Sequence, residues 1–407
     1  MLDFKKIISV CDESSRISES FIDDFLINFI SDKEGLEEKF SRQLSNYRKI
    51  ISKMPEGFSG MLMSQLIAHR IFQQNGLAGK YINHAEIRKR SAKELVFFQF
   101  QMQYPWKYTF CSIVEDLLHD LYRMKDAISG EEFMLYSPGV SKAVTKLGCY
   151  PSLWLFLVGF NGECCQTFGP IAYFRGIQSF DLFFFAKHLN ADITFLNEVP
   201  DMIELNPVPF LMLWSGGEIP VTYHKKDMVV FNKSEYYVKD FSLEKYADDF
   251  LIEKKHPIYM LSLKRWNSFP HFAKCFYHAK KNLLILTSMT ARGYDSLVST
   301  LNKHGNDFPT TPDILCTMAM IHIAKEVLNF NIEMNPYEKH FAKTTSPETQ
   351  QELDKINVFL RSLMDKINNK KDYDIAKLAL KADISLENAE NIEKTVLKKF
   401  SDDSWKR

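Results

Sequence analysis

The sequence lacks cysteines at the spacings that are typical of disulfide-rich and zinc-binding domains. This absence argues against both of these classes of small domain. The cysteines are odd in number, and none of them has the spacing of a zinc-ribbon ligand pair. We expect neither a disulfide framework nor a structural zinc site, and a reducing compartment, the cytoplasm, is the expected location. The adjacent Cys164 and Cys165 are predicted to point to opposite faces of a strand. The seven cysteines are Cys11, Cys111, Cys149, Cys164, Cys165, Cys275 and Cys316.

Long apolar runs and net charge are also lacking, and the first residues do not have the pattern of a secretory signal. The longest apolar run, residues 153–160, is well short of the roughly 18–20 residues that a membrane-spanning helix needs. The N-terminus turns acidic at Asp12 and Glu13 without an apolar segment or a small-residue cleavage site. We therefore expect no secretory signal and no membrane partner. The net charge of zero indicates no global preference for nucleic acid.

Signature motifs of the common enzyme classes are absent as well. The sequence contains no Walker loop, dinucleotide fingerprint, nucleophile elbow, metalloprotease helix or kinase motif set. Catalysis is not excluded, because active sites are often assembled from residues that are distant in the sequence. No reaction can be named from these residues, and no cofactor is expected.

What is present is the composition of a large globular protein. The chain has 407 residues, of which 45% are hydrophobic and 25% charged. Apolar residues recur at helical spacing over residues 12–103, with Ser15 as a potential N-cap and Gly35 between two helices. A chain of this length usually divides into two or three domains. The first is predicted to be a helical domain over residues 1–104.

After Trp106 the apolar residues no longer recur at helical spacing, and turn signals between short apolar runs indicate strands. Asn161-Gly162 lies between two apolar runs and predicts a hairpin, and a second hairpin is predicted around the turn 127–131. Residues 113–125 also fit a helix. We predict a helix over 179–189 and then a meander, whose short turns require antiparallel neighbours. The strands of the meander are residues 210–214, 219–224, 228–232 and 236–238.

The remaining elements complete an α+β fold. Residues 258–263 and 283–287 are predicted strands, and 269–279 and 291–303 are predicted helices. A buried helix is predicted over 314–328 and an amphipathic one over 347–367. The prediction is a helical N-terminal domain, a central antiparallel β-sheet with attached helices, and a helical C-terminal region. The predicted domains are residues 1–104, 105–305 and 306–407.

The strongest chemical signal is an uneven distribution of charge. Residues 254–304 contain nine Lys and Arg and one acid, a net of +8, with aromatic residues such as Trp266, Phe269 and Phe272 between them. Cations beside stackable rings are typical of proteins that bind single strands or other polyanions. Residues 12–38 carry a net of −7. Internal docking of these acidic helices on the basic segment is the more ordinary explanation.

A turn within the basic segment is a candidate anion site. Thr287, Ser288, Thr290 and Arg292 lie between a predicted strand and a predicted helix, where free backbone N–H groups and the helix dipole favour an anion. Ser288 or Thr290 can equally serve as a simple N-cap, which is the more common role. The surrounding cations that we assign to the same anionic partner are Lys264, Arg265, Lys280 and Lys281.

A weak candidate metal site lies in the same segment. On the predicted helix 269–279, the side chains of His271, Cys275 and His278 would share one face. Imidazole and thiolate bind zinc, but no fourth ligand is indicated. We therefore expect no metal.

These observations favour an interaction or regulatory protein over an enzyme. The basic aromatic segment 254–304 would bind an anionic partner, such as nucleic acid, or another protein. The alternative is an enzyme acting on a phosphate-bearing or nucleic-acid substrate, with residues 287–292 holding the phosphate.

Overall fold

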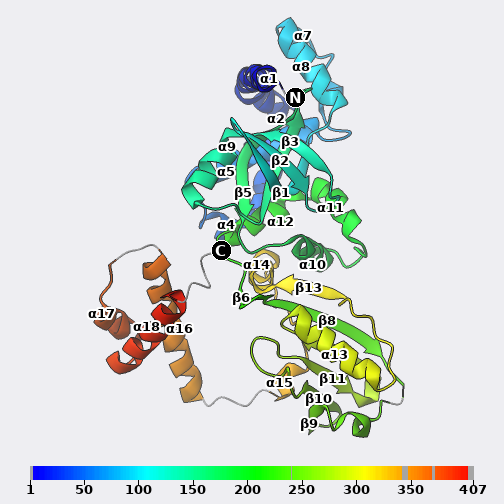
Figure 1. The fold of residues 1–407 in the computed structure, drawn as a ribbon. Coiled ribbons are helices and arrows are strands. Elements are labelled where there is room, and N and C mark those ends of the chain that lie inside the picture. The colour runs from blue at the N-terminus through cyan, green and yellow to red at the C-terminus, as the bar shows by residue number, and fades with distance from the viewer. Residues whose placement is uncertain (1–2, 240, 342–346, 369–371, 402–407) are drawn as a thin grey trace. The chain divides into compact units, whose positions relative to one another are not determined.

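The computed structural model confirms an α+β fold and describes residues 3–239, 241–341, 347–368 and 372–401 (Figure 1). The chain forms two compact units, Met1–Asn335 and Pro336–Arg407. The first unit contains long N-terminal helices, a five-stranded barrel and a six-stranded antiparallel sheet. The second unit is helical.

The N-terminal helices form a layer against the barrel. The first helix begins at Phe4, with Asp3 rather than Ser15 as its N-cap, and it continues into a π-helix, η1 (Ser18–Leu26). Gly35 ends α2 in the left-handed conformation, with a φ of 63°. A capping box of Ser91 and Glu94 starts α8. The helices of the layer are α1 (Phe4–Ile17), α2 (Ile27–Glu34), α3 (Leu36–Ser45), α4 (Arg48–Ile51), α5 (Phe58–Phe72), α6 (Ala78–Tyr81), α7 (Ala85–Arg88) and α8 (Ala92–Gln103).

Five strands close into a barrel beside this layer. Their order is β1-β2-β3-β5-β4, β1 pairs with both β2 and β4, and β3 runs parallel to β5. The helix α9 (Pro138–Leu147) lies between β3 and β4 in the sequence. This is the strand order of the OB-fold, a five-stranded Greek-key barrel. The strands are β1 (Lys107–Leu118), β2 (Leu121–Asp126), β3 (Glu132–Tyr136), β4 (Leu153–Phe160) and β5 (Cys165–Phe174).

Both predicted hairpins are confirmed. The β4–β5 pair is antiparallel, and its turn contains Asn161 and Gly162. The side-chain Oδ1 of Asn161 accepts hydrogen bonds from the backbone N–H groups of Glu163 and Cys164, at 3.0 and 2.9 Å. The alternative of a helix over 113–125 is wrong, because these residues pair along β1 and β2.

The segment after the barrel is mostly helical, so the predicted strand 210–214 is wrong, and the predicted strands 228–232 and 236–238 fall mainly within one continuous strand over residues 230–237. The prolines Pro207 and Pro209 sit in the first turn of a short helix, where the missing N–H costs little. In the 219–224 run only Tyr223 and His224 form a strand. The elements are α10 (Ser179–Leu189), η2 (Leu196–Glu198), α11 (Val199–Leu205), α12 (Pro207–Met212), η3 (Leu213–Gly216), β6 (Tyr223–His224) and β7 (Asp227–Met228).

The six-stranded sheet has the order β13-β8-β12-β11-β10-β9, and α13 packs on one of its faces. The predicted helix 269–279 is wrong, because Lys274–His278 pairs with strands on both sides. The first four residues of the predicted helix 314–328 are wrong, because residues 314–317 form an edge strand and the helix begins at Met318. The elements are β8 (Val230–Tyr237), η4 (Leu243–Tyr246), β9 (Phe250–Lys255), β10 (Ile258–Leu263), β11 (Lys274–His278), η5 (Ala279–Lys281), β12 (Leu283–Ser288), α13 (Ala291–Lys303), β13 (Ile314–Thr317) and α14 (Met318–Leu328).

A buried carboxylate joins the barrel side of the unit to this sheet. Asp181, in the first turn of α10, is fully buried and accepts hydrogen bonds from the backbone N–H groups of Gln178 and Thr317, both at 2.7 Å. The Thr317 hydroxyl donates a third bond at 3.1 Å. Desolvation raises the pKa of Asp181 to about 7 despite these donors.

The C-terminal unit packs its helices around a small apolar core. Ser385 accepts a hydrogen bond from the backbone N–H of Asn388 at the start of α18. Its core contains Phe359, Leu363, Ala379 and Ala389. Its helices are α15 (Glu338–Phe341), α16 (Pro347–Asn368), α17 (Ile375–Ala382) and α18 (Leu386–Ser401). Among the described residues, no helix combines the length and apolar character needed to cross a membrane.

Candidate functional site

The predicted anion turn is a buried helix cap that anchors a neighbouring loop. Thr290 caps α13 by accepting a hydrogen bond from the backbone N–H of Gly293 at 3.1 Å. Its hydroxyl also lies 2.7 Å from Nδ1 of His271, and the Ser288 hydroxyl donates to the carbonyl of His271 at 2.8 Å. Thr287, Ser288 and Thr290 are all buried. The N-cap interpretation of Thr290 is therefore confirmed.

Arg292 is engaged by an internal carboxylate. Its Nε donates to Oδ1 of Asp227 at 2.6 Å, and Nη2 contacts Oδ2 of the same side chain. The hydrogen bonds and charge of Arg292 lower the pKa of Asp227. The hydroxyls and the guanidinium of the candidate anion site thus have partners within the fold.

The four other predicted cations fall at opposite ends of the sheet. Lys264 and Arg265 follow the end of β10, whereas Lys280 and Lys281 lie in the turn between β11 and β12. The strand β10 has six residues, which separates its two ends by roughly 17 Å. Nζ of Lys264 donates to the backbone carbonyls of residues 247 and 248, at 3.0 and 2.8 Å. A single ligand site containing all four cations is therefore not formed.

The acidic N-terminal helices pair with cations of their own layer. Glu13 forms an ion pair with Lys93, and Glu34 forms one with Lys80. Glu38 is paired to a cation one turn further along α3. These pairs do not support docking of the acidic segment on residues 254–304.

Two phenylalanines of the basic segment are exposed at the same end of the sheet as Arg265. The side chains of Phe269 and Phe272 are 60% and 39% exposed, and their ring centroids are 6.3 Å apart. The His224 ring of β6 lies edge-on to Phe269, with 5.0 Å between centroids. Of the other aromatic residues of the segment, those at 276, 277 and 294 are buried, and Tyr259 and Trp266 are half-buried.

Exposed cations surround these rings. Lys225 and Lys226 form the turn of the β6–β7 hairpin next to His224, and both are exposed. Arg265 is exposed in the loop that carries the phenylalanines, and Nζ of Lys274 lies 5.8 Å from the ring centroid of Phe272. We call this group the aromatic surface, and define it as His224, Lys225, Lys226, Arg265, Phe269 and Phe272.

The three weak metal candidates do not converge. His271 lies in a loop, and Cys275 and His278 are on strand β11, so the predicted shared helix face is wrong. Cys275 is fully buried in the core beneath α13, and this burial raises the pKa of its thiol. Among the described residues, no group of three His, Cys, Asp or Glu side chains is arranged to hold a metal.

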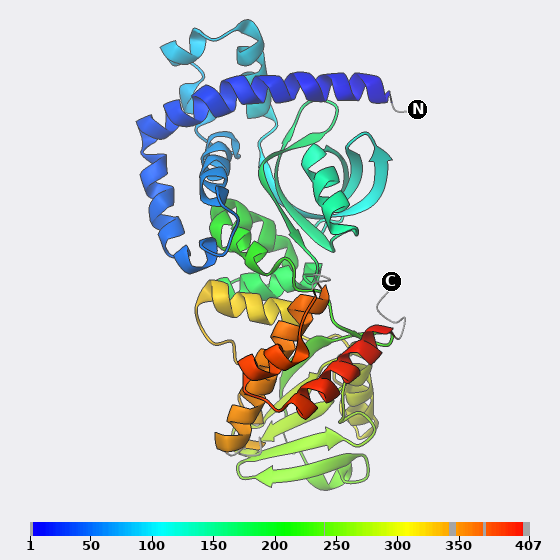
Figure 2. The same cartoon turned by 90° about the vertical axis from the view of Figure 1, so that its left-hand side faces the viewer.

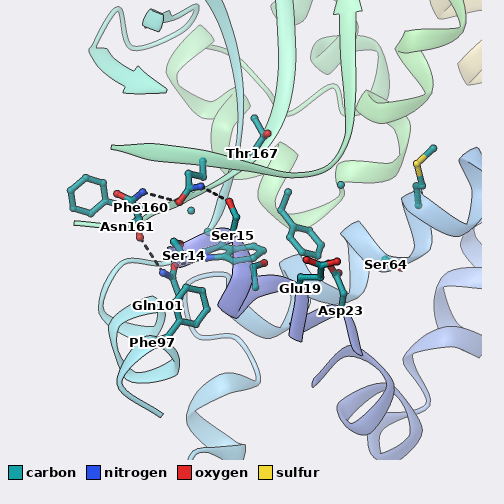
Figure 3. A pocket seen from close by; sticks show the side chains of 17 residues that line it. Ser14, Ser15, Glu19, Asp23, Ser64, Phe97, Gln101, Phe160, Asn161 and Thr167 are labelled. Atoms are coloured by element: carbon teal, nitrogen blue, oxygen red, sulfur yellow. Dashed lines mark hydrogen bonds between the residues drawn. The ribbon is translucent and has the colours of Figure 1, made fainter. Parts of the chain in front are cut away.

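A cleft of about 480 Å³ lies between the N-terminal helices and the β4–β5 hairpin (Figure 3). The π-helix places Glu19 and Asp23 side by side in it, and π-helical segments recur at functional sites. Desolvation, with the nearby charges of Asp24 and Glu19, raises the pKa of Asp23 to about 6. The sequence analysis did not predict this cleft, because its walls come from separate segments spread between Ser14 and Gly169.

Trp106, whose ring stacks on that of Phe72, forms part of the cleft wall. Trp106 lies against Gly159, where an added Cβ would come within 2.4 Å of the indole nitrogen. The indole N–H donates to Oε1 of Gln101 at 2.6 Å, and Nε2 of Gln101 donates to the Phe160 carbonyl at 3.1 Å. A glycine is thus required at 159 for the indole to contact the strand.

Searches of protein-family models, curated protein sequences and solved structures returned no match to this chain. The candidate sites therefore rest on their own geometry and chemistry.

Proposed function

We propose that this protein binds single-stranded nucleic acid through the aromatic surface. The observation that carries the proposal is the exposure of Phe269 and Phe272, at 60% and 39%, in a loop next to exposed cations. Two exposed apolar rings contribute little burial energy to the fold, whereas a partner that covered them would gain that energy on binding. Unstacked bases are flat and apolar on both faces, and the backbone that links them carries phosphates, which matches this combination of rings and charge.

The loop that carries the rings is held rigidly by the residues beneath it. The backbone N–H of Met289 donates to the carbonyl of His271 at 2.7 Å, and Ser288 and Thr290 bind the same residue. A preorganised loop loses little conformational entropy when a ligand binds. The buried hydroxyls of the predicted anion turn support this function indirectly, by positioning Phe269 and Phe272.

The barrel has an architecture that binds nucleic acid in other proteins, but we do not place the binding site of this chain on it. Barrels of the OB-fold often bind oligonucleotides across strands 2 and 3 and the adjoining loops. Here α1 covers that region, because Ile7 and Cys11 pack on Leu121, at the start of β2, and on Cys164 of the β4–β5 turn. Figure 2 shows the N-terminal end of α1 lying across the barrel. The proposal therefore rests on the six-stranded sheet.

The alternative of a phosphate-processing enzyme is not supported by the 287–292 turn. Its hydroxyls are buried and its guanidinium is paired to Asp227. No second observation favours catalysis there.

The test is an equilibrium titration of the full chain with a fluorescent single-stranded oligonucleotide at several salt concentrations. A Phe269→Ala/Phe272→Ala variant should bind roughly fivefold to 150-fold more weakly for each ring that stacks on a base. A Lys225→Gln/Lys226→Gln variant should reduce the slope of log K against log salt by about 0.7 for each lysine that contacts a phosphate.

The matched control is Lys280→Gln/Lys281→Gln, which removes the same charge at the opposite end of the sheet. This variant should keep the affinity and salt slope of the wild type. Equal weakening by both lysine pairs, or no effect of the phenylalanine variant, would contradict a site at the aromatic surface. Circular dichroism spectra of all variants check that the fold is retained.

A further inference from the structure

Two cysteines that are distant in the sequence meet beside the cleft. Cys11, on α1, and Cys164, in the β4–β5 turn, have their sulfur atoms 3.3 Å apart. Both thiols are reduced and buried, with exposures of 0% and 2%. A disulfide has an S–S length of about 2.05 Å, so the sulfurs need to approach by only about 1.2 Å to bond.

The surroundings of this pair distinguish the two thiols. Nδ2 of Asn161 lies 3.3 Å from the sulfur of Cys11 and 3.8 Å from that of Cys164. Hydrogen bonds from Cys164 and Asn161 lower the pKa of Cys11, whereas the hydrogen bond to Cys11, burial and the charge of Cys11 raise the pKa of Cys164. The shorter contact of the Asn161 amide favours Cys11 as the thiolate, and thiolates are the reactive form.

We propose that Cys11 and Cys164 are a redox modification site, at which a peroxide reversibly forms a disulfide between α1 and the β4–β5 hairpin. This inference is independent of the proposed nucleic-acid function. The neighbouring Cys165 is not the partner, because its side chain packs with the core inside the barrel.

The chemistry balances with hydrogen peroxide as the oxidant. The Cys11 thiolate attacks one peroxide oxygen, the O–O bond breaks, and the departing hydroxide takes a proton to leave as water. The Cys164 sulfur then attacks the sulfenic sulfur of Cys11 as its thiol proton is released, the S–O bond breaks, and the departing hydroxide takes that proton and leaves as a second water. Two thiols lose two electrons, and one peroxide is reduced to two waters.

Formation of this bond would fix the first helix on the barrel. In the reduced chain α1 is held there by a small cluster of Ile7, Cys11, Leu121 and Cys164 and by an ion pair of Lys6 with Glu163. The same contacts continue into the cleft: Nδ2 of Asn161 donates to Oε1 of Gln166 at 2.7 Å, and Nε2 of Gln166 donates to the Ser15 hydroxyl at 3.0 Å (Figure 3). A disulfide between the two cysteines would therefore restrain the residues that form one wall of the cleft.

The experiment treats the full chain with hydrogen peroxide, blocks the remaining thiols with an alkylating agent and maps the peptides by mass spectrometry. The expected product is a peptide pair linked through Cys11 and Cys164, about 2 Da lighter than the two thiol peptides and separated again by a thiol reductant. The folded chain should form it roughly tenfold or more faster than the chain in concentrated urea, where the two thiols lose their proximity. Hydrogen exchange over Phe4–Ile17 should be slower in the oxidised protein.

Cys165→Ser is the matched control and should form the same link, whereas Cys164→Ser should not. The exposed Cys149 reports that the oxidant is active. If Cys11 and Cys164 remain fully alkylated while Cys149 is oxidised, the proposal is wrong. Equal rates of linking in buffer and in urea would also overturn it. Both of these results come from the wild-type chain, so they do not depend on the folding of a variant.

Discussion

Asp181 offers a sharp test of how the two β-structures of the first unit are joined. Its buried carboxylate accepts three hydrogen bonds and connects α10 to Thr317 at the start of α14. The perturbation is Asp181→Asn, which keeps the size of the side chain but cannot ionise. One oxygen that accepted hydrogen bonds becomes a donor, so the variant should be less stable than the wild type at low pH.

The magnitude follows from the pKa of this carboxyl. Burial raises the pKa of Asp181 from 3.8 to about 7, so between these values the folded chain holds a proton that the unfolded chain releases. The contribution of this bound proton to the free energy of unfolding is therefore complete below about pH 4 and is lost as the pH rises to 7. A shift of this size corresponds to about 4 kcal/mol.

Urea titrations of both proteins between pH 4 and pH 8 measure the effect. The advantage of the wild type over Asp181→Asn should shrink by about 4 kcal/mol across this range, because only the wild type carries the titrating carboxyl. Asp192→Asn, which alters an exposed carboxylate, should follow the wild-type curve. Parallel curves for the wild type and Asp181→Asn would refute the assignment of a strongly raised pKa.

Three further substitutions test local features. Thr290→Ala should lower the free energy of unfolding by about 1–2 kcal/mol through loss of the α13 cap, and Thr290→Ser should recover most of it in urea titrations. Gly159→Ala should lower the melting temperature and change tryptophan fluorescence by displacing Trp106, whereas Gly60→Ala, with nothing within 4 Å, should not. Asp23→Asn should be more stable than the wild type above about pH 6 and equal to it below pH 4, because the raised pKa of about 6 means that the ionised carboxylate destabilises the fold.

Local signals in the sequence were sufficient where turn or cap chemistry decided the structure. The helix at 291–303 was predicted with its observed bounds, since Thr290 caps it and its apolar positions follow one face. Asn161-Gly162 likewise identified the β4–β5 hairpin. The segment 269–279 was misassigned because its apolar spacing also fits a helix, and only pairing with β10 and β12 makes it a strand. That pairing is a tertiary effect.

The sequence predicted which types of residue form the candidate site, but not which of them are exposed or lie together. The sequence identified cations and aromatic residues within 254–304, yet it could not separate the exposed Phe269 and Phe272 from the buried Phe276. Nor could it show that Lys225 and Lys226, outside that segment, lie beside the rings. The closed barrel and the strand order of the sheet bring these distant segments together. The same proximity creates the cleft and the contact of the two cysteines. It leaves no signal in the local sequence.

The central claim is that nucleic acid lies on the aromatic surface, and photo-crosslinking measures this location directly. A single-stranded oligonucleotide containing 4-thiouridine is irradiated in complex with the full chain, and the crosslinked peptides are identified by mass spectrometry. The account predicts crosslinks in the peptides that contain Phe269 and Phe272 and in the peptide around His224, and loss of these crosslinks at high salt. Crosslinks confined to the barrel strands or to the turn at Lys280 and Lys281 would contradict it.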